Sequence, residues 1–197
     1  MVLPIFPLNG AVLFPGTSLP LNIFEDRYIK MVNYALAKNR HIGMIQTDEN
    51  SKLYNIGCLG KIHSFNETED GRYLISLQGV NKFRIRKELE EDYSFRLVDA
   101  EILKIEDGET EFSDNQRDNL LNRYNNYIKE KNINLNLEEI EKIELSQIIK
   151  FIAMVSPFKD IDKQALLETK SLNEFYNKLL SVIELDIAGD FTTKTVN

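Results

Sequence analysis

The chain has 197 residues, a net charge of −7, and hydrophobic and charged fractions of 43% and 28% that are close to globular averages. This composition excludes a disordered chain or a membrane protein, and its length suits one large domain or two small lobes. Acidic and basic residues balance up to Lys104, so the net negative charge lies in the second half, which counts against nucleic acid as the main partner.

The cysteine content and the uncharged N-terminal segment bear on the compartment. Cys58 is the single cysteine, so no intramolecular disulfide can form and we expect a cytoplasmic protein. No charged side chain occurs from Met1 to Phe24, but a secretory signal needs a basic start and an unbroken apolar helix. This segment is interrupted by Pro4, Pro7, Pro15 and Pro20. We therefore expect neither export nor a membrane association.

The same prolines favour short extended pieces at the start of the chain. Residues 3–8 form one predicted strand, Asn9-Gly10 a turn, and residues 19–23 a second strand after the turn at residues 14–16. Apolar residues then fall at helical spacing, with acidic residues in the first turn, which predicts a helix over residues 25–38.

Four more predicted strands follow, over residues 42–46, 57–65, 73–86 and 93–105. Five or six strands with one early helix indicate a small barrel or a strongly curved sheet, and Gly57, Gly60 and Gly79 are candidate bend positions. In the third of these strands, alternation places Phe83 and Ile85 on one face and the neighbouring basic residues on the other.

The second half of the chain has helical periodicity. A capping box at Ser113 predicts the first helix, and apolar spacing from residue 140 predicts a second that ends at Ser156-Pro157. A short helix follows residues 160–162, and a last one opens at Ser171. We expect an α+β protein with a strand-rich lobe at residues 1–107, a helical lobe at residues 108–188 and a flexible tail at residues 189–197.

No motif for catalysis, metal binding or a cofactor is present. The sequence lacks a nucleophile elbow, a zinc-binding helix and clustered Cys, His or Asp ligands, and residues 57–61 lack the spacing of a phosphate-binding loop. His41, His63 and Cys58 are interpreted as structural residues. We expect a non-enzymatic protein without metal or cofactor; an active site dispersed over the fold is the alternative.

The strongest basic cluster offers a nucleic-acid interpretation. Its members are Lys82, Arg84, Arg86 and Lys87. Phosphate backbones attract such a cluster, but the acidic residues that follow at 88–92 would compete for these cations. A solvated strand face is the simpler interpretation, and nucleic-acid contact is kept as an alternative.

Several ordered blocks resemble the N-terminal substrate-binding domain family of Lon proteases. In the first half they are Leu3-Pro4-Ile5-Phe6-Pro7-Leu8, Leu13-Phe14-Pro15-Gly16, residues 19–25, residues 53–62, Asp70-Gly71-Arg72, and Leu77-Gln78-Gly79 with residues 82–85. In the second half they are Ser156-Pro157-Phe158 and residues 163–168. The resemblance spans about residues 2 to 187. Asn81-Lys82 departs from it, because the family more often has an arginine beside the phenylalanine.

The resemblance implies a PUA-like β-barrel with one helix, followed by an α-helical bundle. It also implies a free-standing, non-catalytic recognition module, because the ATPase module with its Walker loop and the peptidase module with its Ser-Lys dyad are missing from the sequence. The implied partners are protein or peptide clients with exposed apolar segments, and a full-length Lon protease to which the chain could serve as adaptor. RNA binding is the alternative, because PUA-like barrels in other families bind RNA.

The uncharged extended segment near the N-terminus is the candidate site for a peptide. Its residues are Phe14, Pro15, Gly16, Leu19, Leu21 and Ile23. The simpler alternative is that these apolar side chains fill the interior of the barrel.

Overall fold

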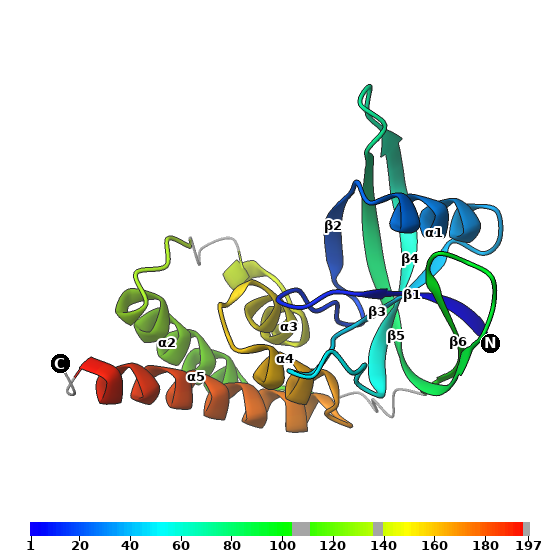
Figure 1. The fold of residues 1–197 in the computed structure, drawn as a ribbon. Coiled ribbons are helices and arrows are strands. Elements are labelled where there is room, and N and C mark those ends of the chain that lie inside the picture. The colour runs from blue at the N-terminus through cyan, green and yellow to red at the C-terminus, as the bar shows by residue number, and fades with distance from the viewer. Residues whose placement is uncertain (104–110, 136–139, 195–197) are drawn as a thin grey trace. The chain divides into compact units, whose positions relative to one another are not determined.

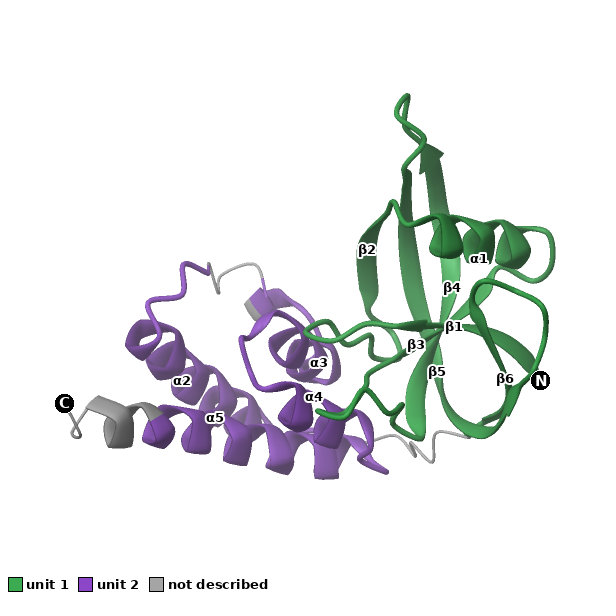
Figure 2. Cartoon of the chain, in the orientation of Figure 1, with its two compact units in different colours: residues 1–105 green, residues 106–197 purple. Residues whose placement is uncertain are grey.

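The computed structural model describes residues 1–103, 111–135 and 140–194, and the chain divides into two compact units, residues 1–105 and 106–197 (Figures 1 and 2). We call them the sheet unit and the helical unit and describe each by itself. The lobe boundary expected at residues 107–108 lies outside the described residues and stays a prediction.

The sheet unit contains six strands and one helix. They are β1 (Val2–Pro7), β2 (Ser18–Ile23), α1 (Asp26–Leu36), β3 (His41–Ile45), β4 (Ile56–Glu67), β5 (Tyr73–Leu89) and β6 (Arg96–Ile102). The order and type of these elements follow the sequence prediction. Strand β6 begins three residues later than expected, because Tyr93 and Phe95 pack their rings against α1 instead of joining the sheet. The predicted end of that strand, at Lys104 and Ile105, lies outside the described residues.

Strand β5 organises the sheet. Its 17 residues pair with β2 in the first half, with β4 along most of its length, and with β6 in the second half. Strands β3 and β1 pair in parallel, whereas all other neighbours are antiparallel. The pairing runs from β5 through β4, β3, β1 and β6 back to β5, while β2 is joined to β5 alone among the described strands (Figure 1).

Apolar side chains from the five strands of this circuit pack together in a core. One core cluster comprises Leu3, Ile5, Ile45, Leu59, Phe83, Val98 and Ala100. The Phe83 ring lies against two glycines: a β-carbon would stand 2.8 Å from the ring at Gly43 and 2.6 Å from it at Gly57. Glycine at these strand positions therefore makes room for a large aromatic side chain, which is a packing role beyond the bend expected at Gly57.

Helix α1 covers part of the sheet with one apolar stripe. Tyr28, Met31, Val32 and Ala35 are buried at helical spacing, and the helix contacts β1 and β3. The rings of Phe6 and Tyr28 lie 4.4 Å apart between centroids. This arrangement confirms the helix predicted from the periodicity.

The helical unit contains α2 (Asp114–Glu130), a 3₁₀ turn (Ile140–Lys142), α3 (Leu145–Val155), α4 (Asp160–Leu167) and α5 (Leu172–Lys194). The capping box at Ser113 is present, and α3 ends before Ser156-Pro157 as predicted. The second predicted helix begins later than expected, since residues 140–142 form a separate turn. Helix α5 continues past Gly189, the residue at which the sequence analysis placed the start of a tail. A helix can tolerate this residue, since a glycine in a helix costs only about 1 kcal/mol relative to alanine.

Helix α5 contacts the other three α-helices of its unit. Polar contacts also join elements distant in sequence. The Tyr127 hydroxyl donates to Asp186 over 2.9 Å, and Lys131 pairs with the same carboxylate at 2.8 Å. The hydroxyls of Tyr124 and Ser156 lie 3.0 Å apart in the interior. Searching the helices of the described residues, we find none with the length and hydrophobicity to span a lipid bilayer.

Candidate functional site

The loop before β2 is fixed to β5 by its backbone. Gly16 donates its N–H to the Gly79 carbonyl over 2.9 Å, and Gly79 donates in return to Thr17 over 2.8 Å. The Thr17 hydroxyl closes the turn by donating to the Phe14 carbonyl over 2.8 Å. Gly16 has a φ of +84°, which glycine adopts readily, while Phe14 and Pro15 are buried. The loop therefore positions β2 and presents only Gly16 to solvent among residues 14–16.

Strand β2 presents a row of apolar side chains on one face of the sheet. Leu19, Leu21 and Ile23 stand opposite Leu77, Ile75 and Tyr73 of β5, and directly paired residues share a face. Ile23 is buried, whereas Leu19 and Leu21 are half-buried. The structure thus places the three leucine and isoleucine positions expected from the sequence in one row, whereas Phe14 is fully buried.

Phe65 of β4 extends this row because of a bulge. The β4–β5 register shifts between Ile62 and Ser64, so that Ile62 opposes Leu77 but Phe65 opposes Ile75. Without the shift, Phe65 would oppose Leu74 and point to the other face. Phe65 is 41% exposed, and its ring packs against Tyr73 at a centroid distance of 4.9 Å.

We call these side chains the β2–β5–β4 apolar face. It consists of Leu19, Leu21 and Ile23 from β2, Tyr73, Ile75 and Leu77 from β5, and Ile62 and Phe65 from β4. The part of this face that solvent reaches consists of half-buried Leu19 and Leu21 and exposed Phe65. These residues lie in two rows across the sheet, Leu19–Leu77–Ile62 and Leu21–Ile75–Phe65, and neither row carries a charged side chain.

The outer edge of β2 is unsuited to continuous strand pairing. Gly79 donates its N–H to the Thr17 carbonyl, which makes Thr17 and Gly79 a hydrogen-bonded pair. Along an antiparallel ladder, hydrogen-bonded pairs alternate with non-hydrogen-bonded pairs. The backbone groups of Leu19, Leu21 and Ile23 therefore face β5, while those of Ser18, Pro20 and Asn22 face outward. Proline has no N–H, so the outward edge lacks its central donor. A ligand at this face must be recognised mainly through side chains.

The basic residues for which nucleic-acid contact was the alternative interpretation are partly neutralised by Glu101 of β6. Arg84 and Arg86 both approach Glu101, at 3.8 and 3.4 Å, and Lys82 and Lys87 lie on the same strand. The next acidic residue, Glu88, accepts two hydrogen bonds from Arg96, which lower its pKa. The cluster is a strand face crossed by ion pairs.

The titratable residues singled out by the sequence do not converge. Cys58 is buried in β4, His63 is exposed further along the same strand, and His41 lies on β3. Burial lowers the pKa of His41, and Lys61 across the ladder adds to the effect. Among the side chains of the described residues, no group of three or more His, Cys, Asp or Glu is placed to hold a metal ion.

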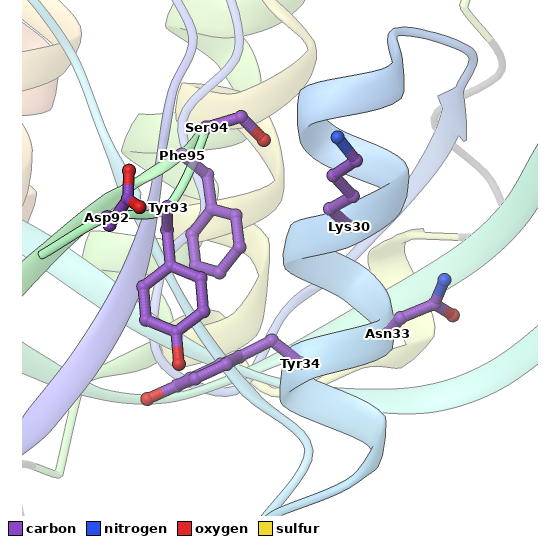
Figure 3. Close-up of a pocket in the computed structure, with 7 residues that line it drawn as sticks. All are labelled: Lys30, Asn33, Tyr34, Asp92, Tyr93, Ser94 and Phe95. Carbon is purple, nitrogen blue, oxygen red and sulfur yellow. The ribbon is translucent and has the colours of Figure 1, made fainter.

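A hollow lies between α1 and the connection from β5 to β6 (Figure 3). Its aromatic wall is formed by Tyr34, Tyr93 and Phe95, whose centroids are 5.0 to 5.4 Å apart. Lys30 lines it from the helix and Asp92 from the connection. Figure 3 shows Asn33 pointing away from the rings, and this side chain donates to the Tyr73 hydroxyl over 3.3 Å.

Sequence reasoning missed Phe65 and the three aromatic residues of this hollow. Tyr93 and Phe95 looked like strand residues because they alternate with polar ones, and Tyr34 falls outside the buried stripe of α1. The one available signal was an aromatic residue at Tyr34 with lysines four residues on either side, Lys30 and Lys38, because this spacing places all three along one side of a helix.

The comparisons with known proteins all identify the same family. The family model described as "ATP-dependent protease La (LON) substrate-binding domain" matches residues 2–184. The Lon protease of Buchnera aphidicola subsp. Baizongia pistaciae is 28% identical over 94% of this chain, and that of Halothermothrix orenii is 29% identical over the same share. In both cases the chain spans 25% of the length of the relative.

A solved structure has the same fold. The Lon N-terminal domain protein from Xanthomonas campestris superposes with a TM-score of 0.69 at 20% identity, covering 92% of this chain and 98% of that one. The sequence match over nearly the whole chain and this structural match point the same way. The chain therefore belongs to the Lon substrate-binding domain family.

Proposed function

We propose that this chain recognises unfolded polypeptides and binds their apolar segments on the β2–β5–β4 apolar face. The observation that carries the proposal is the row of Leu21, Ile75 and Phe65, in which a buried centre is flanked by a half-buried and an exposed apolar side chain. An apolar segment laid across this row would remove both flanking side chains from water. Because Leu21 is already half-buried and Phe65 is 41% exposed, each would contribute about half of the roughly 1.5 to 3 kcal/mol that full burial gives, before binding costs.

The ligand would be read by its side chains rather than by its backbone. Pro20 removes the central donor from the outward edge of β2, so strand addition there would lack one hydrogen bond. Recognition through apolar contact is tolerant of sequence, which suits a module that must accept many unfolded clients. Phe14, Pro15 and Gly16 would act indirectly, by holding β2 against Gly79.

The resemblance to Lon proteases supports two further inferences. We infer that the closed circuit of pairings is a PUA-like barrel and that the helices of the second unit form a bundle. We also infer that the chain itself is non-catalytic and delivers clients, with a full-length Lon protease as one candidate partner. Nothing in the family match favours RNA as the ligand, and Glu101 beside Arg84 and Arg86 would oppose a phosphate backbone.

The test measures binding of a permanently unfolded protein, such as a reduced and carboxymethylated one, and of the same protein in its native form. We expect measurable affinity for the unfolded form only. Leu21→Ser and Phe65→Ser should each weaken it by about tenfold, because each removes roughly 1.4 kcal/mol of apolar contact. Leu74→Ser is the matched control, since Leu74 is 43% exposed on the opposite face of the same hairpin.

Thermal melts of the three variants separate a binding role from a folding role. If Leu21→Ser unfolds the protein, Leu21 belongs to the interior, and Phe65→Ser alone then tests the face. Equal affinity for unfolded and native client, or equal losses in Leu74→Ser and Phe65→Ser, would contradict the proposal.

A further inference from the structure

The hollow between α1 and the β5–β6 connection has the size and composition of a binding pocket. Its volume is about 600 Å³, within the range of roughly 300 to 1,000 Å³ that is usual for ligand pockets. None of the residues that line it belongs to the β2–β5–β4 apolar face, although Asn33 at its rim donates to the Tyr73 hydroxyl of that face. Substitutions at Tyr93 or Lys30 therefore change residues of the hollow alone, and substitutions at Leu21 or Phe65 change residues of the face alone.

The aromatic wall is held in place before any ligand binds. Tyr34 meets Tyr93 and Phe95 edge to face, with interplanar angles of 70° and 61°, and Tyr93 stacks on Phe95 at 27°. Phe95 is 7% exposed and anchors the wall, whereas Tyr93 is 49% exposed. A large aromatic ring kept at the surface by two ring contacts is pre-organised to receive another ring.

Charge is distributed unevenly around these rings. The helix side carries Lys30, and Lys38 follows the end of α1 with its ammonium 2.6 Å from the Tyr34 hydroxyl and 4.1 Å from the ring centroid. The hydrogen bond to Tyr34 raises the pKa of Lys38, and the negative charge of Glu91 adds to this effect. Acidic Glu91 and Asp92 lie on the connection. Of these charged residues, Lys30 lines the hollow from the helix and Asp92 lines it from the connection.

We propose that this pocket binds an aromatic side chain of an unfolded client, next to an acidic residue that pairs with Lys30. The inference rests on the proposed function, since it names the chemistry of a second contact for the same clients. The aromatic ring packs on Tyr93 and Tyr34. The adjacent carboxylate lies toward the helix side, and Asp92 on the opposite side accepts from the client backbone.

The absence of tryptophan from the chain provides a clean probe. A soluble Gly/Ser-rich peptide with one Trp-Asp pair reports its own binding through tryptophan fluorescence, and Trp-Ala and Trp-Lys peptides test the neighbouring charge. We expect the order Trp-Asp, Trp-Ala, Trp-Lys from tightest to weakest. Tyr93→Ser should weaken the Trp-Asp peptide by roughly two- to tenfold, the range of one aromatic pair. Lys30→Glu should weaken it by up to about fivefold and remove the preference for Asp.

Phe24→Ser is the matched control, because Phe24 is 65% exposed and does not line the pocket. It should leave peptide binding unchanged. Binding of Trp-Lys over Trp-Asp, or equal losses in Phe24→Ser and Tyr93→Ser, would overturn the inference. If unfolded protein binds but none of the peptides is distinguished, the pocket proposal fails alone. If neither unfolded protein nor peptide binds, the proposed function fails with it.

Discussion

The carbonyl oxygen of Phe14 lies directly against Gly79 of β5. A β-carbon built at Gly79 would stand 2.1 Å from that oxygen, well inside van der Waals contact. Because the obstacle is backbone, no side-chain rotation can relieve it. The loop that orients β2 is therefore seated on a position that only glycine can occupy without displacement.

Gly79→Ala should destabilise the protein by about 3 kcal/mol or more, since the loop must move away from β5 and lose its two backbone hydrogen bonds. Denaturant unfolding followed by circular dichroism measures the effect. Gly189→Ala is the control, because an added β-carbon meets nothing within 4 Å there, and it should stabilise α5 by up to about 1 kcal/mol. Similar changes in the two variants would contradict the account of the Phe14 contact.

Pro20→Val should promote self-association. It adds an N–H to the outward edge of β2, between the outward donors of Ser18 and Asn22, and completes a template for edge-to-edge pairing. No hydrogen bond to β5 is gained or lost, so the melting temperature should change little. Light scattering after size-exclusion chromatography, over a concentration series, measures the association.

Pro20→Lys restores the same N–H but adds a charge to the edge, and it should stay monodisperse. Should the valine variant remain as monodisperse as the parent, Pro20 would have no protective role at this edge.

Ser156→Ala should cost the helical unit about 1 to 2 kcal/mol, because it leaves the buried Tyr124 hydroxyl without the partner 3.0 Å away. Tyr124→Phe should cost a similar amount, because it leaves the Ser156 hydroxyl without its hydrogen-bond partner. The double variant should cost less than the sum of the two, since neither hydroxyl is then left alone. A double-mutant cycle from denaturant melts measures this coupling, and strictly additive losses would show that the two groups do not interact.

Lys163→Met should stabilise the helical unit at neutral pH by about 1 kcal/mol, because Lys163 is 5% exposed and burial opposes its charge. Burial lowers the pKa of Lys163, an effect that Asp160 partly offsets. The folded state then binds fewer protons than the unfolded state between the lowered pKa and the ordinary lysine pKa of 10.5, so the native lysine becomes less costly as pH rises through that window.

The advantage of Lys163→Met should therefore shrink at alkaline pH. Parallel melts of parent and variant across that range provide the measurement, and Lys170→Met at an exposed position is the control. An advantage that grows with pH would reverse the expected sign.

The local elements could be predicted because their signals are local. Prolines before Phe24 prevented a helix, the period of two marked β5, and Ser113 with Gln116 satisfied the donors at the start of α2. The irregular stretch before β6 could not be predicted in this way. Tyr93 and Phe95 fit a strand pattern, but they precede β6 and their rings contact Tyr34, which is distant in sequence.

The sequence by itself determined the order of strands and helices and the uncharged character of β2. Its blocks that resemble Lon proteases also indicated the family. The tertiary structure decided which of these side chains meet. A register shift of one residue between Ile62 and Ser64 places Phe65 beside Ile75 and Leu21 instead of on the opposite face. Such a shift depends on the packing of paired strands against one another, which no single strand's sequence contains.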